Sequence, residues 1–227
     1  MREEIEMSLE LLHIEHNTPE WLAFRQTGIG GSDAAAVLGV SPFKTNVEVW
    51  EEKVGLRVPE DISAKPQVKY GSEAEAPLFQ LFVLDHPQFR CKQDKEVVYR
   101  RGFMFASLDG ELERISTGEF GVYEGKTTEI HGRSALNKWE KRVPDYYYVQ
   151  LLHQLVVTGW SFSVLKAQLK IIEPDGNIEL LTRHYRYERA DLLEDLKYLY
   201  LEEKAFWGYV ERRERPPLRL PRLDRNT

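Results

Sequence analysis

Residues 103–126 read FMFASLDGELERISTGEFGVYEGK, and this stretch decides the fold. Both of its ends are short aromatic and apolar runs of the kind that form strands. Asp109 follows the first run, and Glu124 lies on the second. Side chains alternate across a strand, so Glu124 and Lys126 share one face. The stretch therefore predicts two carboxylates and a lysine gathered on adjacent strands.

The sequence on either side predicts helices before and after a sheet. Thr45 and Glu48 form a capping box that opens one helix, and Ser32 is suited to cap a short alanine-rich helix. The predicted helices are residues 17–27, 33–38, 45–55, 70–84, 145–158 and 190–210, and the predicted strands are residues 97–99, 103–106, 121–124, 164–172 and 178–187, with a hairpin turn at 174–177. This order predicts an α/β (α+β) domain with a central mixed, mainly antiparallel sheet flanked by helices.

The length of 227 residues predicts a single domain, because one core tends to split only above ~250–300 residues. We assign residues 1–211 to that domain, with an acidic N-terminal segment at 1–16, and residues 212–227 to a basic, proline-containing tail. Hydrophobic residues make up 42% of the chain and charged residues 30%, a balance that argues against global disorder.

The net charge of −6 is unevenly distributed along the chain. Residues 1–20 hold six glutamates against one arginine, whereas the tail holds six arginines against two acidic residues. An acidic total argues against a simple DNA-coating protein, but it leaves room for local basic patches that attract phosphate. The tail has two interpretations: a contact with the DNA backbone or a partner, or a disordered solubilising end.

Several classes of protein are excluded by what the sequence lacks. Cys91 is the only cysteine, so a disulfide framework and a multi-cysteine zinc site are excluded, and the compartment is most simply a cytoplasm. No apolar run approaches the ~18 residues of a membrane helix, and the glutamate-rich start is not a secretory signal. The glycines around Gly30 do not form a dinucleotide fingerprint, and Ser32 is not in a nucleophile elbow.

The chemistry predicted for Asp109, Glu124 and Lys126 is that of an acidic pocket with one internal cation. Hard oxygen ligands of this kind suit Mg²⁺ or Mn²⁺ and not zinc. A divalent ion there activates water and neutralises charge on a phosphoryl group. The alternative is structural, since Asp-Gly is a common turn and Glu-x-Lys is a common exposed strand pattern.

Three further features carry a chemical and a structural interpretation each. Glu75 supplies another carboxylate, or it belongs to a solvated glutamate pair. Gln150 lies in an apolar stretch and must hydrogen-bond a backbone group, a water or a phosphate. Arg25 together with Ser32, at a glycine-rich helix start, can grip a phosphate.

These segments occur together in one known family. They are Trp21-x3-Arg25-x2-Gly28-Ile29-Gly30-Gly31-Ser32, Gly71-x3-Glu75, Asp109-Gly110, Glu124-Gly125-Lys126 and Tyr147-x2-Gln150. The ordered set resembles the YqaJ-type viral recombinase, or lambda phage exonuclease, family of the Asp…Glu-x-Lys nuclease superfamily. The resemblance covers roughly residues 21–159 and implies a restriction-endonuclease-like core. The chain departs from many relatives at Leu108, where they have proline.

The resemblance implies a role for each matched residue, with Mg²⁺, or Mn²⁺ as a substitute, as the cofactor and two ions in each site. Asp109, Glu124 and the Gly125 carbonyl are implied metal ligands, and Glu75 helps to hold the second ion directly or through water. Lys126 positions and activates the attacking water, and Gln150 orients Lys126 or that water. The implied phosphate and DNA contacts are Arg25, Ser32 and Tyr147.

The resulting expectation is a 5′→3′ double-strand DNA exonuclease of a phage recombination system, in a bacterial or phage-infected cell. The resemblance further implies a homo-oligomer, such as a trimeric ring around DNA, and a single-strand annealing protein as partner. The alternatives are an endonuclease of the same superfamily, a non-catalytic DNA-binding recombination protein that keeps the fold, and a plain phosphate-binding metabolic protein.

Overall fold

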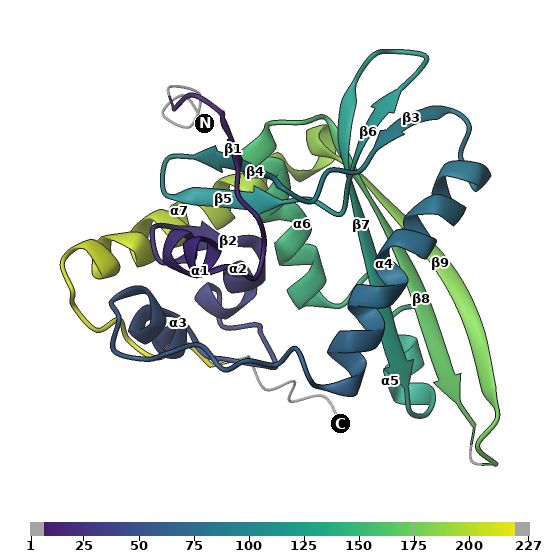
Figure 1. Ribbon diagram of the computed structural model, residues 1–227, viewed down its shortest axis with the longest axis horizontal. Coiled ribbons are helices and arrows are strands. Elements are labelled where there is room, and N and C mark those ends of the chain that lie inside the picture. Colours follow the sequence, from purple (N-terminus) through teal and green to yellow (C-terminus); the bar gives the residue numbers. More distant parts are fainter. Residues whose placement is uncertain (1–6, 174, 221–227) are drawn as a thin grey trace.

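The structure is a computed structural model that describes residues 7–173 and 175–220 (Figure 1). The helices are α1 (Pro19–Arg25), α2 (Gly31–Val37), α3 (Asn46–Lys53), α4 (Pro66–Asp85), α5 (Arg133–Asn137), α6 (Asp145–Thr158) and α7 (Leu193–Glu211), with a 3-10 turn at Arg189–Leu192. The strands are β1 (Glu10–His13), β2 (Ile29–Gly30), β3 (Phe89–Lys92), β4 (Val97–Arg101), β5 (Met104–Ser107), β6 (Gly110–Arg114), β7 (Phe120–Ile130), β8 (Phe162–Ile172) and β9 (Ile178–Glu188). No helix of the described ranges has the length and apolar character that crossing a membrane requires.

The strands form two sheets, and their mixed, mainly antiparallel character is confirmed. The larger sheet has the order β3-β6-β7-β8-β9, with only β7 and β8 parallel. The smaller sheet has the order β1-β4-β5-β2, with only β2 and β5 parallel. Parallel neighbours need a long crossover, and α5 and α6 supply it between β7 and β8. The predicted central sheet is thus divided in two. Strands β4 and β5 pair with β1 and β2 from the N-terminal part of the chain, and not with the strands that follow them.

Helices cover both faces of the larger sheet. Phe79 and Phe82 of α4 pack on one face, and Trp139 and Leu151, from the α5–α6 region, pack on the other. Figure 1 shows α4 crossing in front of β7, while α6 lies between this sheet and the smaller one. Both sheets therefore bury their apolar residues against helices, as two-layer packing requires.

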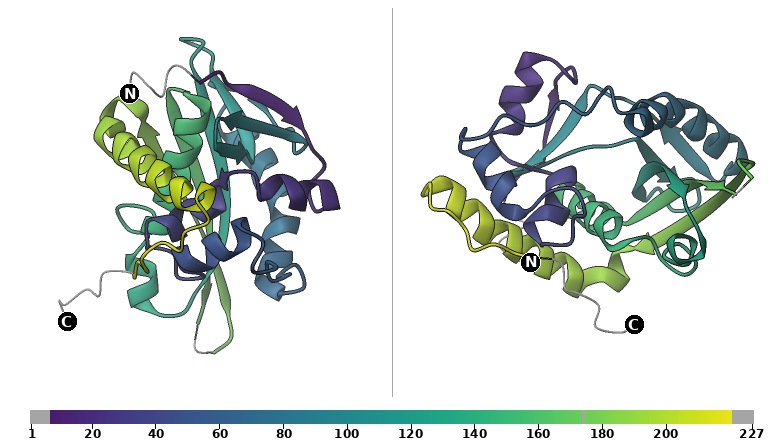
Figure 2. Two further views of the ribbon diagram at one scale, coloured as in Figure 1. Left: turned by 90° about the vertical axis from the view of Figure 1, so that its left-hand side faces the viewer. Right: turned by 90° about the horizontal axis from the view of Figure 1, so that it is seen from below.

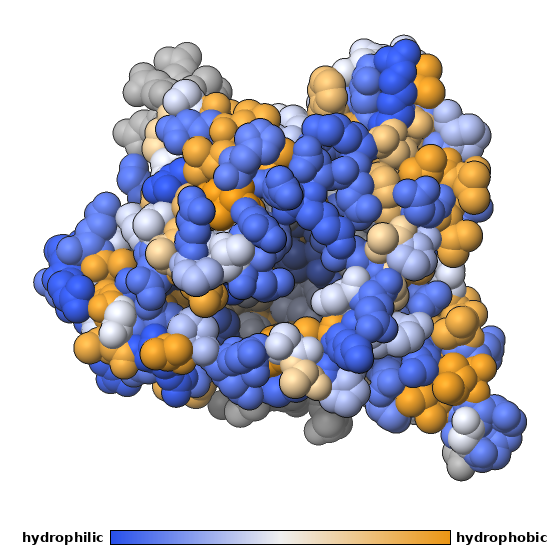
Figure 3. All heavy atoms as spheres, viewed as in Figure 1, coloured by the Kyte–Doolittle hydropathy of each residue, from blue (hydrophilic) through white to orange (hydrophobic). Residues whose placement is uncertain are grey.

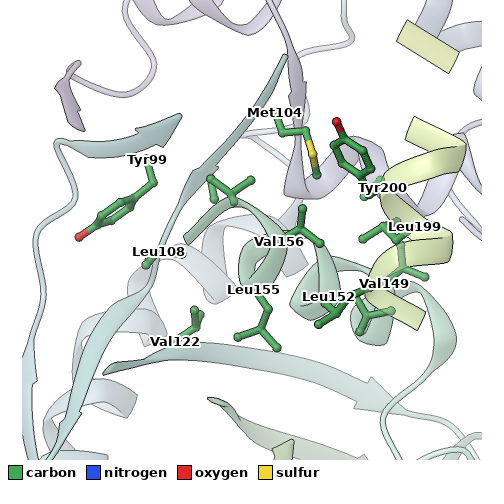
Figure 4. Packing of buried hydrophobic residues seen from close by; sticks show 14 of the residues in the cluster. Tyr99, Met104, Leu108, Val122, Val149, Leu152, Leu155, Val156, Leu199 and Tyr200 are labelled. Carbon is green, nitrogen blue, oxygen red and sulfur yellow. The ribbon is translucent and has the colours of Figure 1, made fainter. Parts of the chain in front are cut away.

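Helix α6 is the centre of the core. Its apolar residues contact strands of both sheets and helix α7, and those shown in Figure 4 are Val149, Leu152, Leu155 and Val156, beside Met104, Val122 and Leu199. Figure 2 shows α7 running alongside α6. Gly159 ends α6 in the left-handed conformation, with a φ of +76°, that favours glycine. Helix α6 is therefore held on nearly all sides.

The start of α2 differs from the sequence prediction. The helix begins at Gly31, with Gly30 as the capping residue, so Ser32 lies inside the first turn and is exposed. The N–H groups that Ser32 was expected to cap therefore lie inside the helix, and the buried Asp33, at the third helical position, accepts the Gly30 N–H through Oδ2 at 3.2 Å. Helix α4 begins at Pro66, earlier than predicted, because proline is well suited to the first turn of a helix.

Part of the basic tail packs against the domain. Asn46 donates through Nδ2 to the Pro217 carbonyl at 2.9 Å, and its Oδ1 accepts the Arg219 N–H at 2.9 Å. Arg219 also pairs with Glu202 of α7. We call residues 212–220 the C-terminal strap. Residues 221–227 of the predicted tail and residues 1–6 of the predicted acidic segment lie outside the described residues, as does Pro174 of the predicted turn.

A fully buried ion pair connects α6 with α7. His153 Nδ1 lies 2.9 Å from Glu203 Oε1, and His153 Nε2 lies 2.9 Å from the Phe105 carbonyl. Both ring nitrogens face oxygen acceptors, so both must donate and the ring must carry two protons. Although burial opposes the charge, Glu203 raises the pKa of His153 above its ordinary value. The pair thus fixes the rotation of α6 against α7 and β5.

Replacing Glu203 alone is expected to destabilise the protein. Glu203→Leu leaves a buried imidazolium without its partner, which should cost roughly 3–5 kcal/mol of unfolding free energy in urea titrations. The double variant His153→Leu/Glu203→Leu removes both charges and should recover at least half of that loss. A double variant as unstable as the sum of the two single variants would contradict a paired, charged state.

Candidate active site

A pocket of about 320 Å³ opens between α4, β7 and the start of α6. Figure 3 shows this face of the molecule hollowed between α4 and the helices α1–α3. The lining residues are Gln67, Val68, Gly71, Ser72, Glu75, Leu78, Asp109, Gly125, Lys126, Thr127 and Tyr147. The structure therefore brings Glu75, Asp109, Lys126 and Tyr147 of the predicted site into one pocket.

Asp109 is held in place by its backbone and by its side chain. It lies between β5 and β6, and its carbonyl accepts Gln93 Nε2 at 3.0 Å. Its Oδ2 accepts the Gly125 N–H of β7 at 2.9 Å. The next residue must be glycine, because a Cβ on Gly110 would lie 2.4 Å from the Phe79 ring. The carboxylate is thus fixed against the middle of β7.

Glu124 is the buried anion of the site, with a side chain only 1% exposed. Lys126, two residues along β7, pairs with its Oε1, as the predicted alternation requires. Gln150 Nε2 donates to Oε1 at 2.6 Å, and Gln154 Nε2 donates to Oε2 at 2.6 Å. Gln150 therefore contacts Glu124, whereas the sequence predicted that it orients Lys126 or a water.

Gln154 is a site residue that the sequence analysis missed. It follows Gln150 by four residues, so the two side chains stack on one face of α6. The available signal was a second glutamine at helical spacing within an apolar run. The two amides hold both oxygens of Glu124 and offset the cost of burying its charge.

Asp109 and Lys126 both have pKa values that are strongly shifted by their charged neighbours. Burial and repulsion from Glu124 raise the pKa of Asp109 to about 8. Burial alone would lower the pKa of Lys126, but Glu124 and Asp109 raise it above its ordinary value. Lys126 is therefore an ammonium in this arrangement, and its Nζ lies 5.5 Å from the centre of the Tyr147 ring.

Glu75 lines the pocket from α4 but has a different partner. Its Oε1 lies 3.0 Å from Lys95 Nζ. Within residues 7–173 and 175–220, no three His, Cys, Asp or Glu side chains are close enough together to hold a metal ion. Asp109 and Glu124 still fit Mg²⁺ or Mn²⁺ by their chemistry, because carboxylate oxygens are the hard donors that these hard cations prefer.

A second charged cluster surrounds the start of α2. Asp33 is fully buried, with Lys53 Nζ at 2.7 Å, Lys44 Nζ at 3.5 Å and an Arg25 NH2 at 3.6 Å. Burial opposes ionisation, but these three cations hold the pKa of Asp33 well below its usual range. Arg25 also donates to Ser32 Oγ at 3.3 Å, so the predicted Arg25–Ser32 pair is present. Lys44 also pairs with Glu52 at 2.8 Å, so three cations face two anions and the cluster keeps a small positive charge.

The two clusters are separate but rigidly connected. Arg25 and Ser32 do not line the pocket that contains Asp109. Gly31 links them, because a Cβ there would lie 3.4 Å from Gln150 Cγ and 3.7 Å from His153 Cδ2. Helix α2 therefore approaches α6 at the turn that carries Gln150. Lys44 and Lys53, which the sequence analysis did not select, belong to the basic cluster because the fold brings α3 beside α2.

Addition of Mg²⁺ or Mn²⁺ is expected to raise the melting temperature more at about pH 8.5 than at about pH 6. The pKa of Asp109 is raised from an ordinary 3.8 to about 8. Without metal, the stability this group contributes is fully present below its unfolded pKa and is lost as pH rises through about 8. A cation binds the ionised form, so it recovers that loss and meets less proton competition at high pH.

Thermal melts across this pH range measure the effect. Asp109→Asn should remove both the gain with metal and its pH dependence, whereas Asp175→Asn, in the turn between β8 and β9, should keep both. An equal gain at the two pH values for the natural chain would contradict a metal bound through Asp109.

Comparison with known proteins identifies relatives of the chain. A family model described as the YqaJ-like viral recombinase domain matches residues 20–161. The uncharacterized protein YqaJ of Bacillus subtilis (strain 168) is 32% identical over 195 residues, which are 86% of this chain and 56% of that protein. The chain thus spans little more than half the length of that relative.

Two solved structures share the fold. The alkaline exonuclease (LHK-Exo) from Laribacter hongkongensis has a TM-score of 0.61 at 18% identity, covering 86% of this chain and 94% of that chain. A phage related exonuclease from Haemophilus somnus 129PT has a TM-score of 0.55 at 11% identity, covering 85% of this chain and 99% of that chain. These matches confirm the predicted fold class, and the family match confirms the resemblance found in the motifs.

Proposed function

The chain belongs to the YqaJ-like viral recombinase family, and from this premise we propose that it is a metal-dependent DNA nuclease. Its preferred mode is 5′→3′ hydrolysis of double-stranded DNA from an end. The observation that carries the proposal is the convergence of three side chains: Asp109 and Lys126 line one pocket, and the buried Glu124 pairs with Lys126 behind its wall. The shared fold with two exonucleases supports it.

In this proposal Asp109 and Glu124 hold Mg²⁺, with the Gly125 carbonyl beside them. Bound there, the metal supplies Lewis-acid activation of water and neutralises charge on the phosphodiester. Gln150 and Gln154 fix the Glu124 carboxylate in one orientation, so little of its freedom is lost when a ligand binds. Glu75 adds a carboxylate from α4, directly or through water, and this requires it to leave Lys95.

Lys126 acts as a positioned ammonium. Its pKa is raised by Glu124 and Asp109, so it donates hydrogen bonds and does not accept a proton. A donor at this point orients the attacking water and stabilises negative charge on the phosphate. Tyr147 borders Lys126 and confines it on the α6 side.

The basic cluster binds a terminal phosphate. Arg25 and Ser32 offer an arginine N–H and a hydroxyl, and Lys44 adds a cation that is part-exposed. Asp33 holds these groups in place from the interior. A phosphate held here, at a fixed separation from Asp109, would explain a preference for DNA ends.

The finer properties implied by the family resemblance are part of the same proposal. They are Mg²⁺ as the natural ion with Mn²⁺ as a substitute, two ions in each site, a homo-oligomer such as a trimeric ring, a single-strand annealing protein as partner, and a cytoplasmic location. The carboxylate chemistry of the pocket supports the choice of ion.

Incubation with linear and covalently closed circular duplex DNA tests the mode of action. With Mg²⁺ the protein should release 5′-mononucleotides from linear DNA and leave the closed circle intact, because the phosphate cluster needs a terminus. EDTA should stop the release. Cleavage of the closed circle would instead assign an endonuclease, and binding without cleavage would assign a non-catalytic recombination protein.

Lys126→Ala should lower the rate of cleavage by roughly 10²–10³-fold, because the charge-stabilising donor is lost. The matched control is Lys170→Ala on β8, since the Lys170 side chain is 23% exposed, against 21% for Lys126, and pairs with Glu129. The Lys170→Ala control should cleave DNA at the wild-type rate, and both variants should unfold cooperatively on heating. A folded Lys126→Ala variant that cleaves DNA at the wild-type rate would contradict the proposed role of Lys126.

A further inference from the structure

Phe43 is an unusually exposed aromatic residue beside Lys44 of the basic cluster. Its side chain lies in the connection between α2 and α3 and is 79% exposed, the second-highest value among the exposed large hydrophobic residues that the structure describes. The ring is therefore open to contact with a ligand at this position.

The ring is part of a path of aromatic contacts that ends at Lys126. Phe43 meets Tyr146 edge-on at a centroid distance of 5.7 Å. Tyr146 packs on Tyr147 at 4.3 Å, and the Lys126 ammonium lies 5.5 Å from the Tyr147 ring. Aromatic rings therefore continue from the exposed Phe43 through the half-buried Tyr146 and Tyr147 to the wall of the catalytic pocket.

The same loop also serves the basic cluster. Lys44, next to Phe43, turns inward to Asp33 at 3.5 Å and to Glu52 at 2.8 Å. Ser41 Oγ accepts the Phe43 N–H at 3.1 Å and the Lys44 N–H at 3.4 Å. Asn46, anchored to the C-terminal strap, fixes the other side of the loop. The Phe43 ring is thus presented by an ordered loop with a phosphate-binding cation beside it.

These neighbours favour a nucleobase as the occupant. The catalytic pocket of about 320 Å³ has the volume of a small-molecule site, so a strand must separate from its complement to reach Asp109. Separation unstacks a base, at a cost of a few kcal/mol, and leaves its flat face uncovered. Every base can stack on an aromatic ring without sequence preference. A protein partner bound to Phe43 would not explain why the ring lies between the Lys44 cation and the pocket that contains Asp109.

We propose that Phe43, supported edge-on by Tyr146, is the stacking platform for an unpaired nucleobase next to the scissile phosphate. The proposal rests on the proposed nuclease function and specifies how the separated strand end is held. Lys44 and Arg25 bind phosphate on one side of the base, and Lys126 faces phosphate on the other. The contact supplies affinity for any sequence, because stacking reads the face of a base and not its edge.

The test is a set of Phe43 variants combined with base removal from the DNA. Each duplex carries either normal nucleotides throughout or one abasic site, placed at the first, second or third 5′ position. Binding is measured by fluorescence anisotropy with Ca²⁺ in place of Mg²⁺, and cleavage is measured with Mg²⁺. The protein variants are Phe43→Leu, which keeps an apolar side chain without a ring face, and Phe43→Trp, which keeps the face. The control is Tyr198→Leu, because Tyr198 is an aromatic residue of α7, 57% exposed, that does not line the pocket.

Phe43→Leu should weaken binding of normal DNA ends roughly 5- to 100-fold, and Phe43→Trp should restore it. One abasic position should weaken binding to the natural chain by a similar factor and have no further effect on Phe43→Leu. Tyr198→Leu should bind like the natural chain.

Two results would overturn the stacking role. One is equal binding by Phe43→Leu and the natural chain. The other is full additivity, in which the loss of binding affinity caused by Phe43→Leu adds to the loss caused by an abasic site at each of the three positions. Either result with normal cleavage by the natural chain leaves the nuclease proposal standing, whereas absence of cleavage and of DNA binding by the natural chain would refute the proposed function itself.

Discussion

The structure depends on the burial of one carboxylate, Glu124. A charge that is almost completely removed from water must have partners, and here they come from two elements. Lys126 is supplied by β7 itself, while Gln150 and Gln154 require α6 to lie on this face of the sheet in one rotation. The requirement explains why a glutamine pair interrupts the most apolar helix of the domain. The anion and the core packing therefore specify the same position of α6.

A second and a third buried anion extend this arrangement outward. Glu203 on α7 holds His153, which lies between the two glutamines along α6. Asp33 on α2 gathers three cations and approaches the same helix through the glycine turn at Gly31. Glu203 and Asp33 are neutralised by cations from outside their own helices, whereas Glu124 pairs with Lys126 of its own strand and accepts hydrogen bonds from α6. The separation between the basic cluster and the carboxylate pocket is consequently set by the packing of α2 on α6, and not by flexible loops.

The elements that could be predicted were those with strong local signals. The periodicity of α6 and α7, the alternation along β7 and the long hairpin of β8 and β9 were correctly placed in outline. The short strands β1, β2, β3 and β6 were missed, because their pairing depends on contacts that a local pattern does not contain. Ser32 was wrongly chosen as a cap, because the helix begins two residues earlier than predicted, at Gly31, where the buried Asp33 accepts the Gly30 N–H.

The candidate site shows the same division. Strand alternation correctly predicted that Glu124 and Lys126 share one face of a strand. Asp109 was expected to end the adjacent strand, but that strand, β5, belongs to the smaller sheet, and the neighbour of β7 is β6, which follows Asp109. The partner of Gln150 could not be identified, and Lys44 and Lys53 were overlooked, since their relation to Asp33 exists only after α3 packs beside α2.

The attachment of the C-terminal strap to Asn46 has a consequence for synthesis of the protein on the ribosome. Asn46 is joined to residues that follow it by 171 and 173 positions, so the loop bearing Phe43 and Lys44 lacks this support until Arg219 has emerged. Closing so long a segment is entropically unfavourable before the intervening domain has folded. The residues that line the carboxylate pocket end at Tyr147, so in a nascent chain they emerge well before the strap that secures the loop bearing Phe43 and Lys44.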